Sequence, residues 1–154
     1  MVSSAIQGNS MNQNNSQLCP DMVLDCIPGN LFADHLAFIQ AVRAGIPGHW
    51  LASVIQSSGA GEGIAKALGV APKKLEAMCR IEALDTRTSE AVMEIARVIS
   101  SCFAVWESPV LADQWLKREV PALGNESPIN LLDTHEGRSW VMDVLRKIED
   151  GQFS

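Results

Sequence analysis

The sequence predicts an all-α protein: a helical bundle in which an N-terminal helix-turn-helix precedes a C-terminal helical domain. Apolar residues recur every three or four positions through most of the chain, which is the spacing of one helix face. Several segments also begin with a capping residue followed by proline and end at glycine. No segment shows the alternating pattern of a half-buried strand. With 154 residues and 47% hydrophobic content, the chain can bury a core of its own.

The first half of the chain should form four helices behind a flexible segment. Residues 1–30 are rich in Ser, Asn and Gln, so we expect them to be flexible. A first helix is expected after Asn30, with an apolar face of Phe32, Leu36, Ile39 and Val42. A second should begin at Pro47 and stop at Gly59, with an apolar face of Trp50, Leu51, Val54 and Ile55. Two short helices, 61–68 and 72–81, should follow.

The second half should contain the spine of the core. A long helix from Thr88 or Ser89 carries one apolar stripe, made of Val92, Ile95, Ala96, Ile99, Cys102, Phe103 and Trp106. Ser-Pro pairs at 108–109 and 127–128 each predict a new helical start. Asp133 with Glu136 should cap the last helix, which should end at Gly151. Its expected buried face is Trp140, Val141, Val144, Leu145 and Ile148.

The two short helices have the spacing of a helix-turn-helix. Such a unit needs a small residue in its first helix, a glycine in the turn and an apolar anchor in its second helix, and Ala65, Gly69 and Leu75 meet these needs. The basic residues that would contact DNA are Lys66, Lys73, Lys74 and Arg80. The alternative is an ordinary helical hairpin with solvated lysines.

The charge is unevenly distributed along the chain. The net charge is −6, but four basic residues and one acid between Lys66 and Arg80 give that segment +3. From Asp85 to Ser154, seven basic and twelve acidic residues give −5. A basic stretch of this kind is compatible with local DNA contact. The acidic half suits a basic protein partner or simply solubility.

No residue pattern indicates catalysis, a cofactor or a metal. The four cysteines, Cys19, Cys26, Cys79 and Cys102, have neither zinc-site nor disulfide-framework spacing, so we expect reduced thiols. The glycines between Gly59 and Gly63 follow no strand and precede no Gly-Lys-Ser/Thr sequence, which argues against a phosphate-binding loop. A secretory leader and a long apolar run are also missing, so we expect a cytoplasmic, non-enzymatic protein without a membrane span.

A spaced motif occupies the region after Pro121. It reads Gly-x-x-x-Pro-x-x-Leu-Leu-x-Thr-x-x-Gly, and its defined positions are Gly124, Pro128, Leu131, Leu132, Thr134 and Gly137. This pattern resembles the C-terminal toxin-binding domain of the Xre/MbcA/ParS antitoxin family. The resemblance implies a helix-turn-helix domain at 31–84 and a toxin-binding domain at 85–154. It also implies a type II antitoxin that neutralises a RES-type, NAD-targeting toxin by blocking its active site and represses its own operon.

The partners that this reading implies are the cognate RES-type toxin, operator DNA and a second copy of the chain. Toxin contacts are expected from the motif and from the end of the chain: Arg138, Arg146, Gly151, Phe153 and Ser154. Phe153 would be an apolar anchor in the toxin's cleft, and the two arginines would face acidic groups.

Two other functions fit the same residues. One is a stand-alone helix-turn-helix regulator whose C-terminal domain only dimerises, and the other is an interaction module with neither DNA nor toxin as partner. The motif could also shape a corner of a generic bundle. In that case Pro128 starts a turn, the leucines fill the core, Thr134 or Asp133 caps the last helix, and Gly137 allows close packing.

Overall fold

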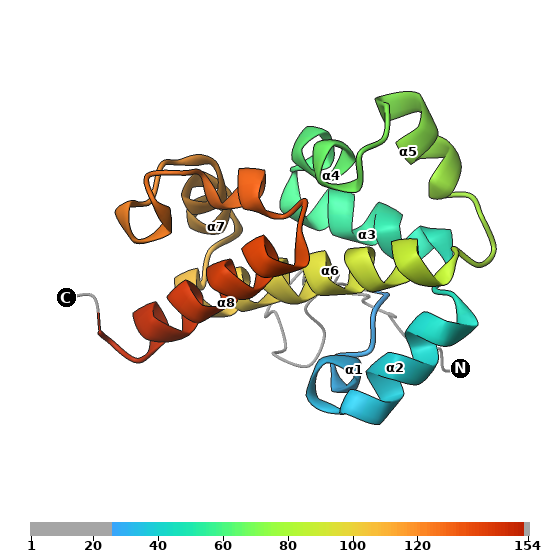
Figure 1. Cartoon of the computed structure of the whole chain (residues 1–154), viewed down its shortest axis with the longest axis horizontal. Helices are drawn as coiled ribbons and strands as arrows, with labels where there is room; N and C mark the ends of the chain where they lie inside the picture. The colour runs from blue at the N-terminus through green and yellow to red at the C-terminus, as the bar shows by residue number, and fades with distance from the viewer. Residues whose placement is uncertain (1–25, 153–154) are drawn as a thin grey trace, which may run out of the picture.

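The structure, a computed structural model, describes residues 26–152, and the regular elements in this range are helical, which confirms the all-α prediction (Figure 1). An isolated antiparallel bridge joins Val120 to Glu126. The α-helices are α1 (Asn30–Ala33), α2 (His35–Ala44), α3 (Gly48–Ser58), α4 (Gly61–Leu68), α5 (Pro72–Met78), α6 (Thr86–Trp106), α7 (Pro109–Lys117) and α8 (His135–Glu149). Two 3-10 turns, η1 (Pro121–Leu123) and η2 (Pro128–Leu131), lie between α7 and α8.

Helix α6 is the spine of the bundle, as its apolar stripe predicted. It crosses the centre of Figure 1, with α3 to α5 on one side, α1 and α2 on the other, and α8 along its length. Asp85 caps its N-terminus, since the Asp85 side chain accepts a hydrogen bond from the Thr88 amide at 2.9 Å. The predicted stripe is buried from Val92 to Phe103, and Trp106 is half-buried.

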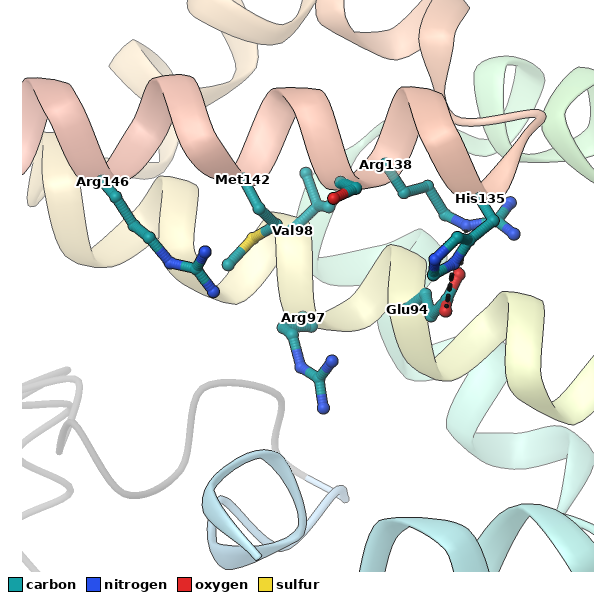
Figure 2. Close-up of a pocket in the computed structure, with 8 residues that line it drawn as sticks. Glu94, Arg97, Val98, His135, Arg138, Met142 and Arg146 are labelled. Atoms are coloured by element: carbon teal, nitrogen blue, oxygen red, sulfur yellow. Dashed lines mark hydrogen bonds and ion pairs between the residues drawn. The ribbon is translucent and has the colours of Figure 1, made fainter. Parts of the chain in front are cut away.

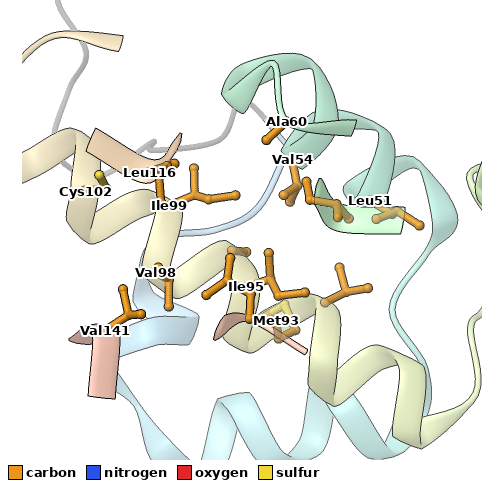
Figure 3. Packing of buried hydrophobic residues seen from close by; sticks show 14 of the residues in the cluster. Leu51, Val54, Ala60, Met93, Ile95, Val98, Ile99, Cys102, Leu116 and Val141 are labelled. Atoms are coloured by element: carbon orange, nitrogen blue, oxygen red, sulfur yellow. The ribbon is translucent and has the colours of Figure 1, made fainter. Parts of the chain in front are cut away.

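A single hydrophobic core runs through the described residues. Leu51 and Val54 of α3 pack with Ile95 and Ile99 of α6 in the same cluster that contains Val141 of α8 (Figure 3). The expected units 31–84 and 85–154 therefore share their core. Residues 1–25 of the segment predicted to be flexible lie outside the described residues, but Ile27 is already buried, so the core begins before residue 31.

The first helix differs from its prediction. The chain forms two helices because Asp34 interrupts the first, and the Asp34 carboxylate accepts hydrogen bonds from the amides of Leu36 and Ala37. This restart rotates the buried face toward Phe38 and Val42. The prediction that Leu36 and Ile39 are buried is wrong, since they are 62% and 41% exposed.

The helix pair α4–α5 forms at the expected place, but α5 is shorter than predicted. Helix α4 has the predicted bounds and ends at Gly69, whose φ of 67° is left-handed. Helix α5 ends at Met78 instead of Ile81 because the Ile81 carbonyl accepts a hydrogen bond from the Gly48 amide at 2.8 Å. The backbone of Met78 and Ile81 lies so close to Gly48 that a Cβ there would overlap it, so this junction requires glycine.

The last helix has a different cap from the predicted one. Thr134 is the N-cap, with its Oγ1 accepting a hydrogen bond from the Gly137 amide at 3.0 Å, whereas Asp133 is exposed. Val141, Val144 and Leu145 are buried as expected. Trp140 is 43% exposed, so the prediction that it is buried with them is wrong.

Within residues 26–152, no single helix is both long and apolar enough to cross a bilayer. Helices α6 and α7 reach that length and composition only as a pair, which is bent by 119° at the break between them.

Candidate functional site

The motif residues from Gly124 to Gly137 form a compact corner between α7 and α8, which we call the motif corner. η1 ends at Gly124, whose φ of 68° is left-handed, and Asn125 follows with a φ of 62°. These two residues reverse the chain so that the Val120 amide can donate a hydrogen bond to the Glu126 carbonyl at 3.1 Å. Pro128 then starts η2, which leads to the Thr134 cap of α8.

Three motif residues hold this corner from the inside. Pro128, Leu132 and Gly137 are buried. A Cβ on Gly137 would overlap the carbonyl group of Leu131, so only glycine lets α8 start this close to η2. The structural account of the motif, in which these residues shape a corner, therefore explains these three positions.

The other motif residues reach the surface, together with a tryptophan outside the motif. Gly124 and Thr134 are exposed, and Leu131 is partly buried. Atom Cη2 of Trp140 lies 3.7 Å from the position of a Cβ on Gly124, so the ring covers this glycine while remaining 43% exposed. Helical spacing predicted a buried Trp140, because this residue adjoins the buried stripe of α8. The structure instead places its ring at the surface, against the motif corner.

The motif corner packs directly on the first helix of the helix pair. Ile129 of η2 lies against Gly63 of α4, where a Cβ would overlap the Ile129 side chain. The glycine-rich start of α4 thus has a packing role. This contact brings the two expected functional regions together at one place.

An ion pair joins α8 to α6 just beyond the corner. The Nε of Arg138 donates to Oε2 of Glu94 at 2.6 Å, and its Nη1 donates to the Leu132 carbonyl at 2.8 Å (Figure 2). The other Glu94 oxygen lies 2.9 Å from Nδ1 of His135. The side chains of Arg138 and Glu94 are only 12% and 13% exposed. Arg138 is thus engaged within the protein, whereas the sequence suggested a side chain free to meet acidic groups of a partner.

Arg146 and the end of α8 have the exposed positions that the sequence suggested. The Arg146 side chain is 64% exposed and pairs with Asp143 at 3.2 Å on the same helix. Gly151 has a φ of 73° and ends α8 as predicted. Phe153 and Ser154 lie outside the described residues.

The candidate DNA-contacting residues lie on the exposed side of the helix pair. Ala65 and Leu75 are buried, whereas the basic side chains point outward, namely Lys66, Lys73, Lys74 and Arg80. Lys66 and Lys74 also line a groove of about 960 Å³ that extends to Thr134 and Arg138. The groove therefore connects the helix pair with the start of α8.

No group of three or more His, Cys, Asp or Glu side chains within residues 26–152 is placed to hold a metal ion. Cys26, Cys79 and Cys102 are unpaired, and burial raises the pKa of Cys102 to about 12, which keeps this thiol protonated at neutral pH.

Comparison with known proteins yields two matches. Residues 101–151, which include α7, the motif corner and α8, match a family described as the antitoxin Xre/MbcA/ParS C-terminal toxin-binding domain. A protein named "Prs ADP-ribosylating antitoxin" from Sphingobium sp. (strain YBL2) is 32% identical over 80 residues, covering 46% of this chain and 50% of the relative. The chain thus spans about half the length of this curated relative.

Proposed function

We propose that the protein is the antitoxin of a type II toxin–antitoxin pair, because residues 101–151 match the Xre/MbcA/ParS C-terminal toxin-binding domain family. The observation that carries the proposal is the motif corner itself. Buried motif residues hold its shape, while Gly124, Leu131 and Trp140 remain accessible to a partner. A rigid turn beside a half-exposed tryptophan is typical of a protein-binding surface, because aromatic anchors contribute most to such interfaces.

The toxin that we propose is a RES-type enzyme that consumes NAD. The relative named above is called an ADP-ribosylating antitoxin, and ADP-ribosylation takes its ADP-ribose group from NAD. The proposed mechanism is steric, in that the antitoxin covers the entrance to the toxin's NAD site. No catalytic group of the antitoxin is needed for such inhibition.

Two elements of the chain could cover that entrance, and a pair of variants separates them. Trp140→Ala removes the exposed ring beside Gly124, and deletion of Gln152–Ser154 removes the end of the chain with Phe153. Removing the element that fills the toxin's NAD site should weaken the binding that causes inhibition by about 1 to 3 kcal/mol, as loss of a hot spot does. Leu36→Ala is the control, because Leu36 is also an exposed apolar residue, on α2, at 62% against 43% for Trp140.

The assay is NAD loss caused by a RES-type toxin co-expressed with this chain, measured against antitoxin concentration. Full inhibition by wild type and by Leu36→Ala, with weaker inhibition by one of the other two variants, supports the proposal. If the wild-type chain neither co-purifies with this toxin nor slows NAD loss, the proposed function is wrong.

We further propose that α4 and α5 bind operator DNA as a dimer and repress the operon. Supporting this are the +3 charge between Lys66 and Arg80, the outward basic side chains, the buried Ala65 and Leu75, and the left-handed turn at Gly69. With roughly three phosphate contacts per subunit, log affinity should fall with log salt at a slope of about −5.

Lys73→Ala combined with Lys74→Ala should flatten that slope, whereas Lys147→Ala on α8 should leave it unchanged. Equal salt slopes for the wild type and the double variant on the upstream promoter fragment would remove these lysines from the DNA site. Promoter binding without any toxin binding would favour the alternative function, a stand-alone regulator whose C-terminal part only dimerises.

A further inference from the structure

The cleft between α6 and α8, shown in Figure 2, has a charge arrangement that the proposed function does not use. Its charged lining consists of one carboxylate, Glu94, together with His135 and three arginines: Arg97, Arg138 and Arg146. Both oxygens of Glu94 are already occupied, one by Arg138 and the other by His135. Among the described lining residues, the cleft thus presents two further arginines, Arg97 and Arg146, to which Glu94 makes no hydrogen bond.

Arg97 is the first of the two arginines that Glu94 does not bind. Its guanidinium carbon is 4.5 Å from the centroid of the Phe38 ring and 6.0 Å from that of Phe32, so aromatic rings hold the group by cation–π contact. Its Nε is buried and has no hydrogen-bond partner within the described part of the chain. A guanidinium held through its face keeps the N–H groups along its edge available, which is how arginine binds planar or tetrahedral oxyanions.

Arg146 increases the excess positive charge. Burial lowers the pKa of Arg97 from its ordinary value, the Arg146 charge lowers it further, and Glu94 opposes both effects. Arginine nevertheless stays protonated in proteins, so two like charges face one cleft. Within residues 26–152, Arg146 pairs with one acid, Asp143, and both side chains of that pair are exposed, which makes it weak and easily exchanged.

The remaining lining suits a small oxyanion. The Ser139 side chain adds a hydroxyl group, and Val98 and Met142 supply an apolar wall. The free volume is about 110 Å³. This equals roughly three or four waters at about 30 Å³ each, which is room for one phosphate group.

We propose that this cleft binds the phosphate group of a small phosphorylated compound between the guanidinium groups of Arg97 and Arg146. The bound phosphate supplies hydrogen-bond acceptors to the Nη groups of Arg97, since the Nε is itself buried, and offsets the repulsion between the two arginines. This site lies on the α6–α8 face and does not depend on a toxin or on DNA. Inorganic phosphate and a nucleotide phosphate share this chemistry, and the experiment distinguishes them.

The test is isothermal titration calorimetry of the full chain with sodium phosphate, pyrophosphate, ADP and acetate at constant ionic strength. We expect saturable binding of the phosphate compounds and much weaker binding of acetate. Tighter binding of ADP than of inorganic phosphate identifies a nucleotide as the source, and equal affinities identify the free ion. Acetate binding as tight as phosphate binding overturns the assignment, because it shows a general anion site.

Three variants test the residues. Arg97→Lys keeps the charge but lacks the guanidinium fork, and Arg146→Gln removes an exposed charge without disturbing the core. Each should weaken phosphate binding about ten-fold or more, which corresponds to about 1.4 kcal/mol. Arg118→Gln, which removes an exposed arginine at the end of α7, should bind as the wild type does. Unchanged affinity in Arg146→Gln, or no saturable binding of any phosphate compound by the wild type, overturns the proposal.

Discussion

At the scale of single residues, Gly137 determines how closely η2 and α8 meet. Its amide donates to the Thr134 cap at 3.0 Å, and its missing side chain leaves room for the Leu131 carbonyl. The obstructing atoms belong to the backbone, so they cannot move aside as a flexible side chain would. Gly137 therefore both donates to the cap of α8 and allows η2 and α8 to pack closely.

Gly137→Ala should destabilise the protein by about 2 to 4 kcal/mol, because the added methyl group must push the Leu131 backbone away from α8. Urea denaturation followed by circular dichroism measures the free energy of unfolding. Lys147→Ala on the exposed side of the same helix is the control and should change stability by no more than about 0.5 kcal/mol. A Gly137→Ala protein as stable as this control would contradict the packing described here.

At the scale of elements, the hydrogen bonds of capping residues show where the helix starts agree with the prediction from the sequence and where they differ. Ser108 accepts a hydrogen bond from the Leu111 amide at 3.3 Å and starts α7 as predicted. Ser127 makes no such bond, and its hydroxyl instead donates to the Lys117 carbonyl at 3.1 Å, which ties η2 to the end of α7. Identical Ser-Pro pairs thus start different elements, an α-helix with a side-chain cap and a 3-10 turn without one.

Asp85→Ala should remove the cap of α6 and cost about 1 kcal/mol at neutral pH. The Asp85 carboxylate accepts hydrogen bonds from the Thr88 hydroxyl and amide, at 2.7 and 2.9 Å, and these bonds lower its pKa below the ordinary value of 3.8. A lowered folded-state pKa means that the contribution is complete above pH 3.8 and disappears as the pH falls through the folded value.

Stability curves of the wild type and Asp85→Ala, measured by urea denaturation, should therefore differ at pH 7 and converge in strong acid. Thr88→Ala is a useful companion, because it removes the hydroxyl donor while the amide donor remains. A difference that stays constant down to pH 2 would show that the carboxylate charge is not involved.

At the scale of the whole molecule, the helix pair and the motif corner pack into one hydrophobic core. Ile64 of α4 is buried in the same cluster as Met93 and Ile95 of α6, and Ile129 covers Gly63. The boundary near residue 85, which the sequence suggested between DNA-binding and toxin-binding regions, falls at a junction inside this core. The Ile46 amide donates to the Ser89 hydroxyl at 3.0 Å across the same junction.

A fragment that begins at Asp85 should therefore not fold as a stable monomer, because α6 would expose the face that α2, α3 and α4 cover. We expect partial helicity by circular dichroism, a broad thermal transition and binding of a hydrophobic dye. The full chain should show a single sharp transition under the same conditions. A fragment with a sharp transition and no dye binding would establish the independent C-terminal domain that the resemblance implies.

The sequence by itself determined the local features of this protein. The α6 stripe, the α3 and α4 stops at Gly59 and Gly69, and the α8 end at Gly151 follow from helical spacing and from glycine's access to positive φ, both of which act over a few residues. The motif from Gly124 to Gly137 indicated a resemblance to the family whose description matches residues 101–151, since its spacing is readable along the chain.

Only the tertiary structure decided which side chains a partner can reach. Trp140 and Leu36 have the spacing of core residues but lie at the surface, and Arg138 resembles a free surface cation but is held by Glu94, 44 residues away in the sequence. Exposure depends on which faces other helices cover, and that depends on contacts between distant segments. Helical spacing shows that a helix has an apolar face, whereas the rest of the fold decides which residues of that face other helices cover.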